Sequence, residues 1–199
     1  MIGRFGAAAA LVLAAGAAAA EGPSFDCATA SGEVEALICA DADLAARDRV
    51  LAATWAEVLA LAEGLDAPGD PAALRAEQRG WIEGGDACRM AGDVAACVAA
   101  AYDDRTSELQ AFWGLAPVTG EAVWRCGPER RGEVVTRFHG TPRPSVRIER
   151  GDAVRVGLLA PAASGARYAL PFGAEFWMKG GEAMLSWTEG EVEDCEVAE

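Results

Sequence analysis

Six cysteines, all downstream of an export signal, constrain this chain more than any other feature. Residues 1–20 combine a basic start at Arg4, an apolar run over 5–15 and small residues up to Ala20, which is the pattern of a cleaved signal peptide. Exported chains fold in an oxidising compartment, most simply a bacterial periplasm, where an even number of cysteines predicts disulfides. The six are Cys27, Cys39, Cys88, Cys97, Cys126 and Cys195.

The cysteines have the spacing of neither a zinc site nor a lipid attachment site. No two of them form a Cys-x-x-Cys pair, and the single histidine, His139, is far in sequence from five of them. Cys27 lies beyond the predicted cleavage point after Ala20 rather than at it, and the run over 5–15 is too short to span a bilayer. We therefore expect a periplasmic protein with no membrane anchor, no metal and no cofactor.

The chain is strongly acidic, with 31 Asp and Glu against 17 Lys and Arg and a formal net charge of −14. The imbalance is concentrated in one half, because residues 21–120 hold 18 acidic and 6 basic side chains, whereas residues 121–199 hold 13 and 10. This charge excludes nucleic acids and anionic membranes as partners held by a basic surface, and it favours a cationic partner. The alternative is that the acidity serves only solubility.

The apolar pattern changes near the middle of the chain and predicts an α+β protein of two domains. Residues 21–115 are alanine-rich, with three apolar stripes at helical spacing that predict a helical hairpin with a third helix. After a linker at 116–121, residues 122–199 form short alternating runs separated by Gly and Pro, typical of an antiparallel β-barrel or sandwich of about eight strands. The stripes consist of Leu44, Leu51, Trp55, Val58, Leu59 and Ala62; of Leu74, Trp81 and Ile82; and of Val94, Val98, Ala101, Tyr102, Leu109 and Phe112.

Both halves are too small to rely on a core alone, and the cysteines suggest how each is stapled. Antiparallel packing of the first two helices would bring Cys27 and Cys39 close to Cys88 and Cys97, so we expect two disulfides from the first pair to the second, with the pairing left open. Cys126 on the first strand and Cys195 on the last would join the ends of the β-half and close a barrel.

Candidate catalytic groups are few. His139 stands alone before Gly140, and the acidic pairs Asp41/Asp43 and Asp103/Asp104 lie on or beside helices, where they are better explained as helix-terminal or solvated charges. The chain contains no phosphate-binding loop and no Gly-x-Ser-x-Gly motif. We therefore predict that the protein is not an enzyme.

Two predicted turns of the β-half carry the most informative polar residues. Ser164 and Gly165 follow Pro161 between two strands, and Lys179 ends a strand before Gly180 and Gly181, a two-residue hairpin signal. Lys179 is the only lysine, while every other cationic side chain is arginine. This favours a role for a compact ammonium that a planar guanidinium cannot fill, although ordinary turn chemistry would also place these residues here.

The β-half resembles the MliC-type inhibitors of C-type lysozyme over residues 122–197. The resemblance lies in Trp-Arg-Cys at 124–126, Ser-Gly-Ala-Arg-Tyr at 164–168, Phe-Trp-x-Lys-Gly at 176–180, Glu-Ala at 182–183 and the closing Cys195. It implies a disulfide-closed antiparallel β-barrel whose inhibitory residues are Ser164 and Lys179, with Gly165, Arg167 and Tyr168 in the same lysozyme-contacting motif. The stretch 169–174 is slightly longer than the family pattern, which could separate the two turns.

The helical half is similar to the LprI-type four-cysteine domain of exported bacterial proteins. The similarity lies in Ser-Phe-Asp-Cys at 24–27, Glu-Ala-Leu-Ile-Cys-Ala-Asp at 35–41, Gln-Arg-Gly-Trp at 78–81, and Cys88 followed by Cys97. It implies an association with lysozyme inhibition but assigns no functional residue.

The function expected from these observations is inhibition of C-type lysozyme, with Ser164 and Lys179 in the active-site cleft of the target. One alternative is a cell-envelope module that binds a glycan or another protein. Another is a hydrolase in which Lys179 activates Ser164 as a nucleophile. The sequence predicts no oligomeric state.

Overall fold

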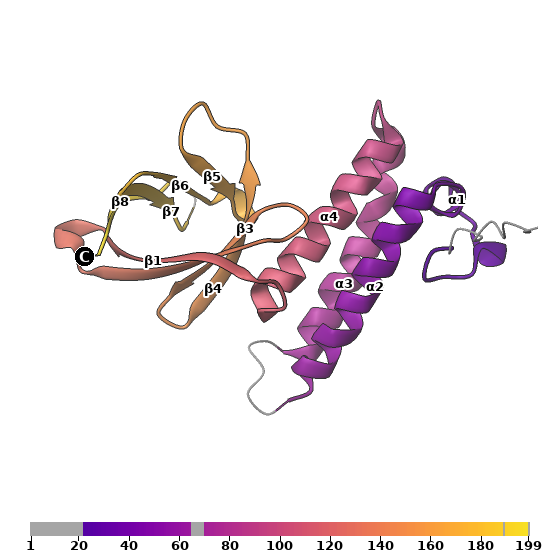
Figure 1. The fold of residues 1–199 in the computed structure, drawn as a ribbon, viewed down its shortest axis with the longest axis horizontal. Helices are drawn as coiled ribbons and strands as arrows, with labels where there is room; N and C mark the ends of the chain where they lie inside the picture. Colours follow the sequence, from indigo (N-terminus) through magenta and orange to yellow (C-terminus); the bar gives the residue numbers. More distant parts are fainter. Residues whose placement is uncertain (1–21, 65–69, 189, 199) are drawn as a thin grey trace, which may run out of the picture.

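A computed structural model describes residues 22–64, 70–188 and 190–198, so the predicted signal peptide lies outside the described residues. The chain forms a helical half followed by a β-barrel, and the two lie side by side along the long axis of the molecule (Figure 1). The predicted two-part α+β architecture is confirmed. Within the described ranges, no helix is both long and apolar enough to cross a membrane.

The helical half contains four α-helices in its described residues, one more than predicted, and aspartate side chains cap the starts of the last three. Asp41 has extended backbone and accepts hydrogen bonds from the N–H groups of Asp43 and Leu44, so it separates the first helix from the second. Asp93 caps the last helix, which ends at Gly114 in the left-handed conformation. The elements are η1 (Cys27–Thr29), α1 (Glu33–Ala40), α2 (Ala42–Ala62), α3 (Pro71–Gly85), η2 (Asp86–Met90) and α4 (Val94–Trp113).

The helical core follows most of the predicted apolar stripes. Leu51 and Val58 of α2 pack with Leu74 of α3 and Leu109 of α4, and all four are buried. Ile82 departs from the prediction: it is 62% exposed and borders a groove instead of filling the core. A second cluster joins Ile38, Leu44, Cys88 and Val98, so the ends that carry the cysteine pairs do come together.

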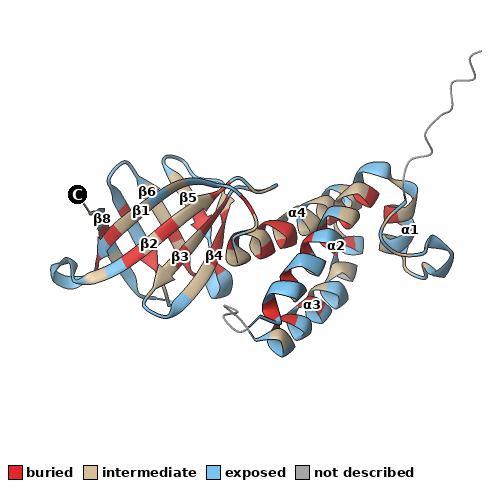
Figure 2. Ribbon diagram, turned by 60° about the horizontal axis from the view of Figure 1, so that its bottom comes forward, coloured by how far each residue is buried: buried red, intermediate tan, exposed pale blue. Residues whose placement is uncertain are grey.

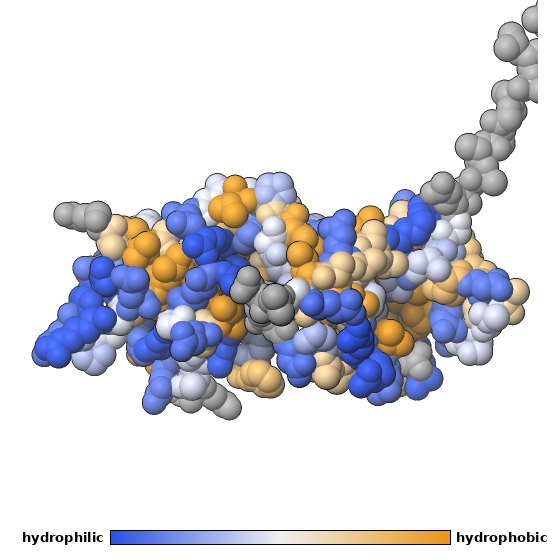
Figure 3. All heavy atoms as spheres, turned by 90° about the horizontal axis from the view of Figure 1, so that it is seen from below, coloured by the Kyte–Doolittle hydropathy of each residue, from blue (hydrophilic) through white to orange (hydrophobic). Residues whose placement is uncertain are grey.

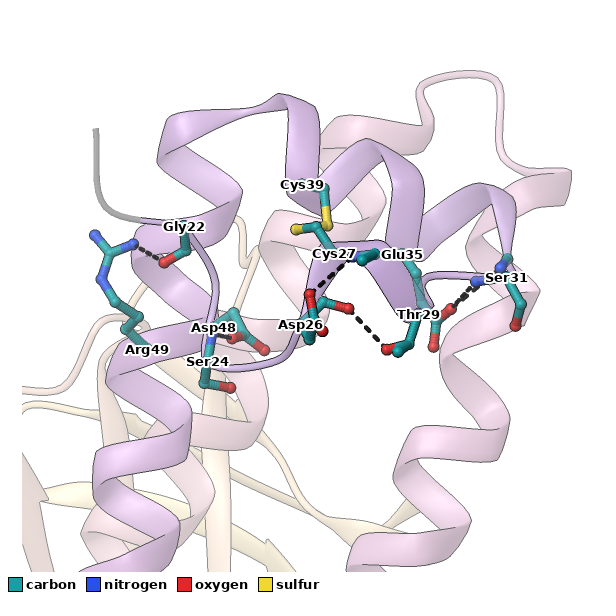
Figure 4. Close-up of a disulfide and its surroundings, with 12 residues drawn as sticks. Gly22, Ser24, Asp26, Cys27, Thr29, Ser31, Glu35, Cys39, Asp48 and Arg49 are labelled. Atoms are coloured by element: carbon teal, nitrogen blue, oxygen red, sulfur yellow. Dashed lines mark hydrogen bonds between the residues drawn. A yellow bond between two sulfur atoms is a disulfide. The ribbon is translucent and has the colours of Figure 1, made fainter. Parts of the chain in front are cut away.

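The predicted disulfides between the two cysteine pairs are wrong. Cys27 is bonded to Cys39, and Cys88 is bonded to Cys97. Each bond closes a local loop. The chain turns back through η1 onto α1 at Cys27–Cys39 (Figure 4), and through η2 onto the start of α4 at Cys88–Cys97. The Cα atoms lie 5.9 Å apart in Cys27–Cys39 and 5.5 Å apart in Cys88–Cys97, and both separations are usual for a disulfide. Neither bond links the first cysteine pair to the second.

The second half is a closed antiparallel barrel of eight strands, as predicted. Neighbouring strands pair in sequence order, and β1 closes the barrel on β8 with Cys126 directly opposite Cys195. The predicted Cys126–Cys195 disulfide is confirmed. The strands are β1 (Val118–Cys126), β2 (Gly132–His139), β3 (Ser145–Arg150), β4 (Ala153–Ala160), β5 (Ala166–Ala169), β6 (Glu175–Lys179), β7 (Glu182–Ser186) and β8 (Val192–Val197).

The barrel core is filled by alternate residues of the strands, as Figure 2 shows by the buried positions along them. Trp124 lies at its centre, with its ring edge-on to Phe176 at 5.4 Å between centroids. The Trp124 indole N–H donates to Thr136 Oγ1 at 2.9 Å, so its polar atom is satisfied inside the core. This packing fixes the strand ends that carry the turns described below.

Helix α4 holds the two halves in one arrangement. Ala111 and Phe112 pack against Val156 and Leu158 of β4. Next to this contact, the Arg143 guanidinium donates to the Asp104 carboxylate at 2.7 and 2.9 Å, and the Arg143 backbone N–H donates to Ser107 Oγ. The face seen in Figure 3 is mainly hydrophilic, with separate apolar patches rather than one continuous apolar surface.

Candidate functional site

Ser164 and Lys179 lie on the same surface of the barrel. Ser164 is in the turn from β4 to β5, and Lys179 is the last residue of β6, paired with Glu182 across the β6–β7 hairpin. Gly180 has φ +61° in this two-residue turn, a conformation that favours glycine. Both side chains are exposed and line one hollow, so the longer stretch over 169–174 does not separate them.

Gly165 allows the Ser164 turn to touch the end of β6. Its φ is +69°, and a Cβ atom at this position would lie 2.3 Å from the Met178 carbonyl oxygen and 3.2 Å from the Lys179 Cβ. No side chain larger than hydrogen fits there without movement of the backbone. The glycine therefore sets the spacing of the serine and lysine.

Trp177 fixes the same turn through a hydrogen bond. Its indole N–H donates to the backbone carbonyl oxygen of Ser164 at 2.8 Å. The Ser164 hydroxyl, by contrast, makes no hydrogen bond to any described residue. The backbone of Ser164 is thus held in place while its side chain stays available to a partner.

The hollow between these residues has a volume of about 410 Å³ and crosses the β6, β7 and β8 strands. Trp177 and Met184 form an apolar floor, since they are directly opposite each other in the β6–β7 register. Glu182, Asp194 and Glu196 supply carboxylates at its margin, and Arg130 bonds to Glu196. The Cys126–Cys195 disulfide lies beneath, because Cys195 also lines the hollow.

Lys179 differs from every other cationic side chain in the described barrel. Its ammonium has no ion pair and no hydrogen bond to a described residue. The barrel arginines within 118–188 all pair with a carboxylate, except Arg155, which contacts the carbonyl oxygen and ring of Trp187. The paired arginines are Arg125, Arg130, Arg131, Arg137, Arg143, Arg147, Arg150 and Arg167.

The other residues of the predicted contact motif have different surroundings. Arg167 points outward beside Trp177 and pairs with Glu175 at 3.5 Å. Tyr168 is only 8% exposed and packs in the barrel core, where burial raises the pKa of its phenol. The structure thus brings Ser164, Gly165 and Lys179 together at the surface, with Arg167 at the side and Tyr168 beneath.

The residues set aside as catalytic candidates have structural surroundings. His139 is 4% exposed, and its Nδ1 lies 3.1 Å from the Ala116 carbonyl oxygen, at the junction between the two halves. Asp41 caps α2, Asp103 pairs with Arg47, and Asp104 pairs with Arg143.

Trp177 and Met184 are the apolar residues of this site to which the sequence assigned no role, although Trp177 belongs to one of the family motifs. Both occupy outward positions in their strands, one residue from the buried Phe176 and Leu185. An apolar residue at an outward position of an alternating strand was the available signal, because it breaks the pattern of polar residues on the solvent side.

Comparison with known proteins divides the chain at the same place as the fold. Residues 26–109 match the family described as lysozyme inhibitor LprI, and residues 124–194 match the family described as membrane-bound lysozyme-inhibitor of c-type lysozyme. Lipoprotein LprI of Mycobacterium bovis and of Mycobacterium tuberculosis are each 31% identical over 168 residues, covering 83% of this chain and 80% of the relative. No solved structure matches. The two expected resemblances are confirmed, in the expected order along the chain.

Proposed function

The chain belongs to the LprI family of lysozyme inhibitors, and from this premise we propose that it inhibits C-type lysozyme by placing Lys179 and Ser164 in the active-site cleft. Both matched families are described as inhibitors rather than enzymes. We further propose that the mature protein acts in the periplasm, where it protects the cell wall.

The observation that carries this proposal is the unpaired ammonium of Lys179. C-type lysozyme cleaves its substrate between a protonated carboxylic acid and an ionised carboxylate. An ammonium about 4 Å from that carboxylate gains about 4 kcal/mol at an effective dielectric constant of about 20, before the cost of desolvation. Among the described residues, Lys179 has no partner to give up when it moves from water into such a cleft.

Ser164 and the apolar floor complete the complementary surface. The free hydroxyl can donate a hydrogen bond to one cleft group and accept one from another. Trp177 and Met184 can cover the apolar part of the cleft rim. The close contact of the Gly165 turn with the end of β6 would reduce the entropy lost on binding, because it restricts how far Ser164 can move relative to Lys179.

The hydrolase alternative lacks support in this geometry. Activation of Ser164 by Lys179 requires a hydrogen bond from the hydroxyl to the amine. No such bond joins these two described side chains. The alternative of a glycan-binding module is separated from inhibition by the experiment below.

Replacement of the lysine tests the proposal. We expect Lys179→Ala to weaken inhibition of C-type lysozyme by about 2–5 kcal/mol, the usual cost of removing one member of a buried charged contact. Lys179→Arg should recover only part of the potency, because a planar guanidinium differs in shape from an ammonium. The measurement is the turbidity decrease of bacterial cell walls treated with lysozyme at increasing inhibitor concentration.

Arg131→Ala is the matched control, since it also removes one exposed cation of the barrel but lies outside the hollow. It should inhibit like the unchanged protein. If folded Lys179→Ala, checked by circular dichroism, is as potent as Arg131→Ala, the proposed mechanism is wrong.

A further inference from the structure

The helical half contains a groove that the proposed inhibitory turns do not use. Its volume is about 480 Å³, and residues of α1, α2, α3 and α4 line it together with the segment before η1. Four of its lining side chains are aromatic, namely Phe25, Trp55, Trp81 and Tyr102. Trp81 and Tyr102 meet edge-to-face at 5.1 Å, and Ile82, 62% exposed, stands at the side.

The motifs by which the helical half resembles the LprI family converge on this groove. They lie in four separate parts of the sequence, yet members of each line the same cavity. These members are Ser24, Phe25, Glu35, Ile38, Gln78, Trp81 and Cys88. Phe25, Ile38 and Trp81 also pack in the helical core clusters, so these motifs both hold the helices together and border one solvent-accessible space.

Two carboxylates face the groove, and neither has a cationic partner among the described residues. Asp48, only 8% exposed, accepts hydrogen bonds from the Tyr102 hydroxyl and the Ser24 N–H. Glu35 accepts from the N–H groups of Ser31 and Gly32, and these bonds lower the pKa of its carboxyl. Figure 4 shows Asp48 beside Ser24 and Glu35 beside Ser31.

The two carboxylates act electrostatically on Tyr102, whose side chain lines the groove. Burial, together with the charges of Asp48 and Glu35, raises the pKa of the Tyr102 phenol. Ionised carboxylates next to aromatic faces form a suitable site for a cation, because a guanidinium or ammonium gains both ion pairing and cation–π attraction. A neutral sugar could stack on the rings and donate hydroxyl hydrogen bonds to the carboxylates, but it would gain no ion pairing from the two charges.

We propose that this groove binds an arginine or lysine side chain of a second C-type lysozyme molecule, in addition to the one held by the barrel. This inference rests on the proposed function for the identity of the basic partner, and on the acidic excess of residues 21–120 for charge complementarity. The groove and the Lys179 hollow lie toward opposite ends of the molecule, near α1 and near β8 (Figure 1). The full chain should therefore bind two lysozyme molecules.

The experiment measures binding of C-type lysozyme to the full chain by titration calorimetry, at low salt. We expect two lysozymes per chain. In the Lys179→Ala background, one should remain, and an oligomer of N-acetylglucosamine that fills the lysozyme cleft should not compete with it. Ile82→Arg, which places a cation beside the groove, should abolish this remaining binding, and Glu35→Gln should weaken it about two- to fivefold, as expected for one exposed ion pair. Glu35→Gln keeps the helix cap, since Gln also serves at this position.

Two variants control for net charge. Leu61→Arg and Glu33→Gln make the same charge changes on exposed positions outside the groove, and both should bind like the Lys179→Ala background alone. A stoichiometry of one, or equal binding by Ile82→Arg and Leu61→Arg, would overturn the groove proposal and leave the Lys179 mechanism intact. If Lys179→Ala still inhibits fully while the groove variants lose binding, the Lys179 mechanism is wrong and the groove proposal stands. Binding to cell-wall glycan is measured with the same variants. If the groove variants lose glycan binding that does not depend on salt, and keep lysozyme binding, the ligand of the groove is not a cation.

Discussion

Gly165 touches the strand that ends in Lys179, and this contact decides whether Ser164 and Lys179 act together. The sequence predicted both turns, because Ser-Gly and Lys-Gly-Gly are strong turn signals at the ends of alternating runs. It could not predict that Gly165 lies against the Met178 carbonyl or that Trp177 bonds to Ser164, since both contacts join the β4–β5 turn to β6 in a barrel whose register is set by the whole sheet.

We predict that Gly165→Ala destabilises the barrel and weakens inhibition. The left-handed backbone costs about 1 kcal/mol for alanine, and the overlap with the Met178 carbonyl oxygen adds to this because the turn must move away from β6. Urea denaturation gives the stability, and the lysozyme turbidity assay gives the potency.

Gly173→Ala provides the comparison, because Gly173 has φ +73° but no atom within 4 Å of the added Cβ. It should lose only the backbone contribution and keep its potency. Equal losses of stability and potency in the two variants would show that contact with β6 does not position Ser164.

At the scale of elements, the strands were the most predictable part and the disulfides of the helical half the least. Alternating runs placed all eight strands, since one face of each strand must fill the barrel. The pairing of Cys27 with Cys39 was beyond sequence patterns, because it depends on a short turn through η1 and on a separate helix α1 that ends at Asp41. The predicted burial of Ile82 was wrong for a related reason. Its apolar stripe has only three residues, and the groove that Ile82 borders is formed by residues from four helices.

The boundary between α1 and α2 gives the second prediction. Asp41→Ala removes the carboxylate that accepts from the Asp43 and Leu44 N–H groups, and we expect a loss of about 1 kcal/mol in the free energy of unfolding. Asp41→Asn should retain most of the stability, because an amide oxygen also accepts these bonds. Urea denaturation of both variants measures the difference, and an Asp41→Ala protein as stable as Asp41→Asn would contradict the role of this cap.

At the scale of the whole molecule, the acidic charge is distributed unequally between the two halves. The helical half carries most of the acidic excess, and the contacts of Arg143 with Asp104 and Ser107 keep this half in a fixed position relative to the barrel. A basic partner therefore meets a long-range field whose direction is constant with respect to the Lys179 turn. Such a field acts mainly on the rate of encounter.

The third prediction concerns that rate. The association rate with C-type lysozyme should fall as ionic strength rises, while the dissociation rate changes little. A variant with Glu33, Glu57 and Glu83 changed to Gln, all exposed and outside any ion pair among the described residues, should associate more slowly at low salt only. Stopped-flow fluorescence measures both rates. Association rates that do not depend on salt would show that the acidic half does not steer the partner.

Closure of the barrel also limits how this protein can meet other chains. Because β1 pairs with β8 over Trp124–Cys126, the two end strands of the sheet are neighbours, and this reduces the hydrogen-bonding edge available to a foreign strand. Closure therefore favours recognition by side chains at turns and outward positions over addition of a strand. The same closure limits strand-by-strand growth between identical copies, because the two end strands of the sheet already pair with each other.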